Sequence, residues 1–245
     1  MRKILLGVAT LGAVLAVVPM FAAFEAHVVN VTARIENALF VHPAEIAYGT
    51  VFPQEHLWSD FFLSFSESFS AGDQTRVGTV EYVIKQKPKP RAEYVAAVGV
   101  EAARDYCHLT DPVDAGNLND PYYANCYPNL CPYLSKHEMT PDGGNPLNPL
   151  ENDGPAIPPF HDPDNPASWA VGKIVKLPAI GRDSSDDWYI DLAVPCFKGH
   201  CAQDWASFVT GLNPNVVNPN EYQLPASLEH EVFGCDLWVE VTDIY

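Results

Sequence analysis

Apolar and polar residues alternate along much of the chain, and this pattern predicts strands. Every second position is apolar in residues 61–69 apart from Glu67, with serines at most of the positions between, and again in 233–241. Residues 77–84 and 188–194 have the same character. Successive side chains of a strand point to opposite faces, so a period of two is typical of strands with one buried face. We therefore expect an all-β fold, an antiparallel sandwich or jelly roll of about seven to nine short strands.

One helix is expected among these strands. Asp204 precedes Trp205, Phe208 and Val209, whose spacing places them on one face of a helix, and Gly211 follows. Aspartate is favoured as an N-cap and glycine at a helix end. The sequence therefore predicts a short helix that Asp204 caps and Gly211 ends.

The first 23 residues have the pattern of an export signal. Arg2 and Lys3 precede the apolar stretch 4–18, and the small residues that follow offer cleavage points between residues 23 and 26. Left uncleaved, residues 4–24 are long enough, at about 20 residues, to span a bilayer. We expect cleavage, a single mature domain over 24–245 that is secreted or held at the cell surface, and membrane attachment only if the signal remains.

The segment directly after the signal is expected to be a strand as well. One face carries alternate, mainly apolar residues, namely His27, Val29, Val31, Ala33 and Ile35. A strand near the start of an exported chain can pair within its own domain or complete the sheet of a neighbouring molecule. Both arrangements stay open from the sequence.

Residues 111–166 depart from the strand pattern, since they hold more than half of the 22 prolines, interleaved with Asn, Asp and Gly. So long a stretch without regular structure is uncommon inside a compact domain. We expect a loop insertion on the surface, over about 104–168.

Six cysteines lie in the exported part: Cys107, Cys126, Cys131, Cys196, Cys201 and Cys235. An even number in an oxidising compartment predicts three disulfides, and fifteen pairings stay open. Two C-x4-C pairs, at 126–131 and 196–201, approach the spacing of zinc ligands. Thiolate ligation requires reduced cysteines, so export favours disulfides.

The acidic composition and the absence of catalytic motifs reduce the number of function classes that fit this chain. A formal net charge of -17 disfavours nucleic acid and anionic membrane surfaces as partners. H-E-x-x-H and G-x-S-x-G are both absent, so we expect no enzyme and name no catalytic residue. Calcium is the one cofactor with candidate ligands, in two acidic turns, although carboxylates there can equally cap their own loops. These candidates are Asp162, Asp164, Asp183, Asp186 and Asp187.

Residues 46–55 form a Gly- and Pro-containing turn that leads into the alternating strand from Phe61. Over residues 24–90 the chain thereby resembles the TasA/camelysin-type secreted β-sandwich proteins, in which a G-x-x-x-P-G-[DE] turn precedes a strand. Gln54 stands where that turn has its second glycine, the residues after the signal differ from the usual start, and the cysteine-bearing insertion has no counterpart. The metallopeptidase activity described for camelysin-type proteins is not carried over, because the chain lacks a zinc motif.

The resemblance implies a jelly-roll subunit of extracellular biofilm fibres. In such filaments the N-terminal strand of one subunit completes the sheet of the next, so we expect self-association into a polymer. A different hypothesis is a glycan- or protein-binding module whose insertion supplies aromatic rings, which could instead pack in a loop-rich core. These rings are Tyr122, Tyr123, Tyr127, Tyr133, Phe160 and Trp169. A hydrolase has the least support.

Overall fold

The computed structural model describes residues 37–70, 78–138, 155–175 and 185–245, and here the strands form antiparallel sheets with a few short helices. The expected signal, the expected strand at 27–35 and Asp183 lie outside the described residues. The strands are β1 (Leu39–His42), β2 (His56–Leu57), β3 (Asp60–Phe65), β4 (Thr79–Pro88), β5 (His137–Glu138), β6 (Ala170–Val175), β7 (Asp186–Tyr189), β8 (Leu192–Ala193) and β9 (Cys235–Ile244). The α-helices are α2 (Glu67–Ser70), α3 (Ala92–Val98), α4 (Val100–Leu109), α5 (Pro121–Asn125) and α6 (Trp205–Leu212). Short 3-10 turns cover Cys131–Tyr133, Pro166–Ser168, Pro219–Tyr222 and Ala226–Leu228.

The first sheet has the order β1-β3-β7-β5, and each neighbouring pair is antiparallel. In β3 the alternation is as predicted, because Phe61, Leu63 and Phe65 are buried while Phe62 and Ser64 are only half-buried. The strand is shorter than expected. It ends at Phe65, and Phe69 belongs to α2.

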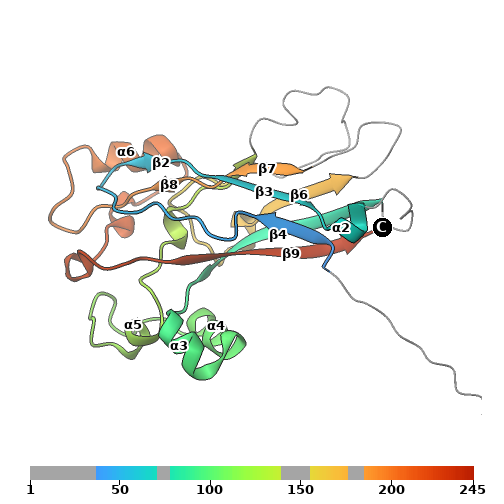
Figure 1. Ribbon diagram of the computed structural model, residues 1–245. Helices are drawn as coiled ribbons and strands as arrows, with labels where there is room; N and C mark the ends of the chain where they lie inside the picture. The colour runs from blue at the N-terminus through green and yellow to red at the C-terminus, as the bar shows by residue number, and fades with distance from the viewer. Residues whose placement is uncertain (1–36, 71–77, 139–154, 176–184) are drawn as a thin grey trace, which may run out of the picture. The chain divides into compact units, whose positions relative to one another are not determined.

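The second sheet has the order β6-β4-β9, and the long strands β4 and β9 lie side by side (Figure 1). Their pairing runs from Pro88 opposite Cys235 to Val80 opposite Ile244, with one irregularity between Glu81 and Tyr82. Both strands were predicted, and both extend beyond the expected residues. A two-stranded sheet of β2 and β8 completes the set.

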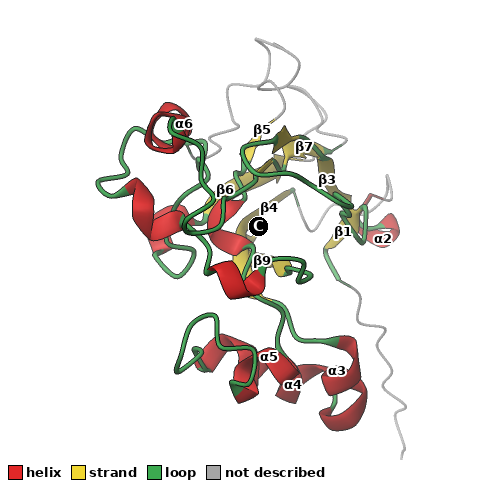
Figure 2. Ribbon diagram, turned by 90° about the vertical axis from the view of Figure 1, so that its left-hand side faces the viewer, coloured by secondary structure: helices red, strands yellow, loops and turns green. Residues whose placement is uncertain are grey.

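The two larger sheets share one hydrophobic core, which includes side chains of β3, β4, β6 and β7 (Figure 2). Polar contacts within it join the sheets. Tyr82 of β4 donates a hydrogen bond to Asp186 of β7 (2.6 Å), and the Trp188 indole donates to the Tyr82 hydroxyl (2.8 Å). Because a buried hydroxyl without a partner is costly, these bonds stabilise one relative placement of the sheets.

Part of the expected insertion belongs to this core. Tyr133, Leu134, Ile157 and Phe160 are buried in the same cluster as the strand residues, so the stretch 104–168 does not lie wholly on the surface. A Pro-rich segment can cross the interior here because its backbone N–H and C=O groups have hydrogen-bond partners. Lys136 and Ile157, for example, exchange two backbone hydrogen bonds of 2.7 and 2.8 Å.

Helices α3, α4 and α5 gather on one side of the sheets (Figures 1 and 2). The sequence analysis expected a single helix, after Asp204, so α3, α4 and α5 were not predicted. Ala103 and Cys107 form the buried face of α4, and the Asp120 side chain caps α5 by accepting from the Tyr122 amide at 2.9 Å. Around them lies a small core of Cys107, Tyr122, Tyr123, Cys126 and Leu228.

The six cysteines form three disulfides, which confirms that prediction and excludes zinc ligation by these thiols. The pairs are Cys107–Cys126, Cys131–Cys235 and Cys196–Cys201. The predicted helix after Asp204 is also present as α6. Its details differ, because the Asp204 side chain makes no capping hydrogen bond and the helix continues through Gly211 to Leu212.

Candidate functional site

A groove of about 660 Å³ opens between the end of β1, with the loop 43–48 that follows it, and the start of β9. In the described part of the chain β1 pairs only with β3, and β9 only with β4, so each strand has one edge without a strand partner, although Gly234, directly before β9, pairs with Asn129. Its bottom is made by buried core residues, Phe61, Leu134 and Ile190. Its apolar walls are Val41, Ile46 and Tyr48 on one side and Leu237 and Val239 on the other.

One end of the groove is polar, where β9 begins. Arg104 of α4 lies with its Nε 3.8 Å from a carboxylate oxygen of Asp236 and its guanidinium 5.5 Å from the centre of the Trp238 ring. Burial raises the pKa of Asp236, while the positive charges of Lys89 and Arg104 oppose this rise. The groove therefore offers an apolar floor and two basic side chains in an otherwise acidic protein.

A second cluster of chemically reactive side chains surrounds Asp191. The expected strand at 188–194 is broken there, since β7 ends at Tyr189 and β8 begins at Leu192. Sequence alternation put Asp191 on the exposed face, which was wrong, because its side chain is only 1% exposed. The Asp191 Oδ2 accepts from the Ser135 hydroxyl at 2.9 Å and lies 3.4 Å from His137 Nδ1 and 3.8 Å from His56 Nε2.

The electrostatics of this cluster are set by burial. Burial raises the pKa of Asp191 to about 6, and the Ser135 hydrogen bond and His56 only partly oppose it. Burial also lowers the pKa of His137. The Asp191 Oδ1 and the His56 Nε2 have no hydrogen-bond partner among the residues described. The carboxylate is thus incompletely satisfied inside the protein.

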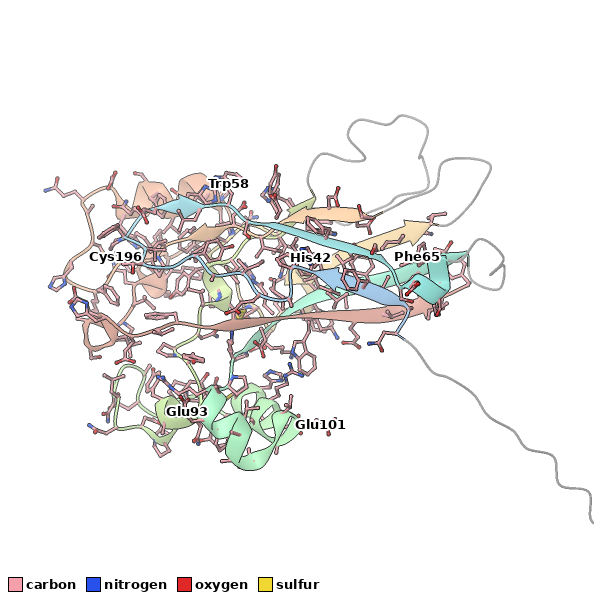
Figure 3. All side chains as sticks on the ribbon, in the orientation of Figure 1. His42, Trp58, Phe65, Glu93, Glu101 and Cys196 are labelled. Carbon is pink, nitrogen blue, oxygen red and sulfur yellow. A yellow bond between two sulfur atoms is a disulfide. The ribbon has the colours of Figure 1, made fainter. Side chains whose placement is uncertain are left out.

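An exposed indole covers this cluster. Trp58 is 58% exposed and lies on the opposite side of the fold from Glu93 of α3 (Figure 3). Its ring centre is 4.6 Å from that of His56, 5.7 Å from that of His137 and 5.7 Å from that of Tyr189. The rings shield one side of the histidines while the indole faces solvent.

The order of contacts differs from a serine hydrolase relay. There the histidine stands between hydroxyl and carboxylate and takes the hydroxyl proton, whereas the Ser135 hydroxyl bonds directly to Asp191. In the described ranges no three His, Cys, Asp or Glu side chains are grouped so that they could hold a metal ion. We therefore assign neither a nucleophile nor a metal to this cluster.

The calcium candidates have separate roles in the described structure. Asp162 and Asp164 are exposed, and Asp162 accepts from the Asp164 amide at 3.0 Å, which is the loop-capping turn weighed against calcium. Asp186 is buried against Tyr82, and the exposed Asp187 accepts from the Ser185 hydroxyl.

The aromatic residues of the expected insertion mostly fill cores. Tyr122, Tyr123, Tyr133 and Phe160 are each less than a tenth exposed, so their faces are not available to a sugar. Tyr127 and Trp169 are half-buried beneath the cations of Arg91 and Lys85. The alternative of packing in a loop-rich core accounts for the four buried rings.

No family model, curated protein or solved structure matches this chain. No helix in the described ranges is long and apolar enough to cross a membrane.

The Asp191 cluster was missed by sequence reasoning because His56, the segment of Ser135 and His137, and Asp191 itself are far apart in the chain. The sequence feature that could have pointed to this cluster is an aspartate in the middle of an otherwise apolar run, 188–194.

Proposed function

We propose that this protein is a secreted structural subunit of extracellular fibres, a jelly-roll sandwich that polymerises by strand donation. In this proposal residues 27–35 of one copy enter the groove of the next copy, between β1 and β9. The observation that supports it most directly is the groove itself, because core residues form its bottom and two strands with one paired side form its borders.

The donated strand has the side chains that such a groove requires. Val29, Val31 and Ile35 share one face of the predicted strand, and burial of each contributes about 1.5 to 3 kcal/mol. The backbone groups of the strand would hydrogen-bond along an unpaired strand edge, the recognised mode of strand addition. Donor and acceptor surfaces differ, so the contact is head-to-tail and generates filaments rather than closed dimers.

Two further observations agree with this function. Gln54, which replaces the turn glycine of the TasA/camelysin-type pattern, has a φ of 66°, the left-handed conformation that glycine adopts most readily. The backbone of this turn is therefore of the kind that the resemblance implies. Three disulfides are typical of proteins folded in an oxidising compartment, which agrees with secretion.

The test uses the mature chain and a deletion of residues 24–36. Electron microscopy should show fibres for the mature chain, and the deletion variant should give only folded monomer by size-exclusion chromatography. Leu237→Asp, which places a charge in the groove, should abolish fibres as well. Val171→Asp, at an exposed position of the other edge strand, β6, is the matched control and should keep them.

A mixing experiment makes the test specific to donation. The deletion variant keeps its groove and the Leu237→Asp variant keeps its strand, so an equimolar mixture should form a one-to-one complex and no fibre. Fibres that persist without residues 24–36 would contradict the proposal. A mature chain that stays monomeric at all concentrations, with its first strand in its own groove, would contradict it too.

A further inference from the structure

A lysine with no acidic partner lies in the core. Lys136 is completely buried, and its Nζ donates to the Gln86 Oε1 at 2.6 Å and to the Ser168 carbonyl at 2.7 Å. None of the ion pairs within the described part of the chain involves it. A charged amine is costly in such a place, and burial lowers the pKa of Lys136 to about 7. At neutral pH a large fraction of these amines therefore carries a free electron pair.

The amine lies against a polarised carboxamide. The Gln86 Nε2 donates to the Cys131 carbonyl at 3.1 Å, which fixes the amide so that Oε1 faces both Lys136 and His161. If the amide were flipped, its NH2 group would face the Lys136 amine, another donor, and its oxygen would face the Cys131 carbonyl oxygen, another acceptor. His161 Nε2 lies 2.8 Å from the same Oε1, so this contact is attractive only when Nε2 carries a proton.

These contacts combine a nucleophile, an electrophile and a donor to the developing oxyanion. The carbon Cδ of Gln86 is bonded directly to the oxygen to which Lys136 donates, so attack requires the neutral amine to turn its electron pair from this hydrogen bond toward Cδ. Donors aimed at a carbonyl oxygen stabilise the tetrahedral intermediate of acyl transfer, and His161 is such a donor in the tautomer that carries its proton on Nε2. The other tautomer donates from Nδ1 to the Pro158 carbonyl oxygen, which is also 2.8 Å away. Burial keeps water away from the reacting groups, because Gln86 is 1% and His161 9% exposed.

We propose that Lys136 and Gln86 form an intramolecular isopeptide bond. The Nζ electron pair attacks Cδ, and the carbonyl electrons move onto Oε1, where His161 stabilises them. A proton passes from Nζ to the amide nitrogen, the bond from Cδ to that nitrogen breaks, and ammonia leaves with the bonding electrons. The products are one secondary amide and one ammonia, and no oxidant or co-reactant is needed.

The bond would join two parts of the core that backbone hydrogen bonds connect only indirectly. Gln86 lies in β4, between β6 and β9, whereas Lys136 lies in the segment that pairs with Ile157. The cross-link is intramolecular, so it is independent of the proposed fibre function.

Intact mass spectrometry of the mature protein tests this inference. We expect a mass lower than the sequence with three disulfides by one ammonia, and a branched peptide joining Gln86 to Lys136 after proteolysis. Gln86→Glu should lose one water instead and give the same branched product. Lys136→Met should lose neither, while Lys85→Met, a neighbouring lysine of β4 that pairs with Glu240, should still lose ammonia.

Two outcomes would overturn the inference. One is a mature protein whose mass shows no loss of ammonia and whose Gln86 and Lys136 are recovered in separate peptides. The other is ammonia loss that peptide mapping assigns to a different residue. Both measurements use the wild-type protein, so they stand even if the Lys136→Met variant fails to fold.

Discussion

Asp191 destabilises the fold at neutral pH because its carboxylate is buried and its Oδ1 has no hydrogen-bond partner among the described residues. Its pKa is about 6 in the folded protein against an ordinary value of 3.8. Between these two values the folded state binds more protons than the unfolded state. The contribution of Asp191 to the free energy of unfolding therefore falls as pH rises through this range, and the loss is complete above about pH 6.

Asp191→Asn should remove this dependence. The amide keeps an acceptor for Ser135 but does not titrate, so the free energy of unfolding of the variant relative to wild type should rise by about 2 to 3 kcal/mol between pH 4 and pH 7. The variant must be compared with wild type because burial lowers the pKa of His161 to about 4. This shift makes the free energy of unfolding of wild type rise with pH in the same range, which opposes the effect of Asp191. Urea unfolding at several pH values measures it.

Asp187→Asn provides the control for this measurement. Asp187 is an exposed aspartate close to Asp191 in the chain, and it accepts from the Ser185 hydroxyl. Its replacement should leave the pH profile of wild type unchanged. A constant difference between wild type and Asp191→Asn would mean that the folded carboxyl titrates normally.

At the scale of elements, the sequence predicted strands better than helices. The alternation in β3 and β4 was sufficient because one face of each is buried. In β9 it holds only for the first half, where Leu237 and Val239 pack against the core, whereas Val241 is exposed. Helices α3 and α4 were missed because a short Ala- and Val-rich run fits either structure. In α4, Cys107 packs in the small core with Tyr122 and Leu228, contacts that the local sequence does not reveal. The groove could not be predicted, because it depends on how two sheets from distant segments meet.

Among the three disulfides, Cys131–Cys235 is expected to contribute most to the free energy of unfolding. It joins the turn at Cys131–Tyr133 to the start of β9 and closes a separation of 104 residues, whereas Cys196–Cys201 closes five. A cross-link stabilises mainly by restricting the unfolded chain, by about 4 to 5 kcal/mol for the longer loop and about 2 kcal/mol for the shorter.

Replacing both cysteines of each pair by alanine tests this difference. We expect Cys131→Ala with Cys235→Ala to lower the free energy of unfolding by about 2 kcal/mol or more beyond the loss in Cys196→Ala with Cys201→Ala. Each pair has one fully buried and one half-buried member, so the lost packing is comparable. Equal losses in urea unfolding would show that native contacts, not loop length, determine the effect.

At the scale of the whole molecule, net charge opposes the proposed assembly. The formal net charge is -17, and the expected cleavage of the signal would remove Arg2 and Lys3 and so increase the acidic excess. Subunits of equal charge repel one another within a screening distance of about 30 Å at 10 mM salt and about 8 Å at 150 mM. Strand donation gains its free energy from apolar burial and backbone pairing, which salt does not screen. Salt should therefore favour fibres by weakening the repulsion alone.

We expect the concentration needed for fibre formation to fall as sodium chloride is raised from about 10 to 150 mM, followed by light scattering. Calcium chloride at matched ionic strength should have an equal effect if screening is the cause, and a greater one if the acidic turns bind calcium. The Leu237→Asp variant should stay monomeric in every salt, because screening cannot restore a blocked groove. Stronger assembly at low salt would contradict this account, since it would mean that opposite charges, such as an acidic surface against Lys89 and Arg104 in the groove, hold the subunits together.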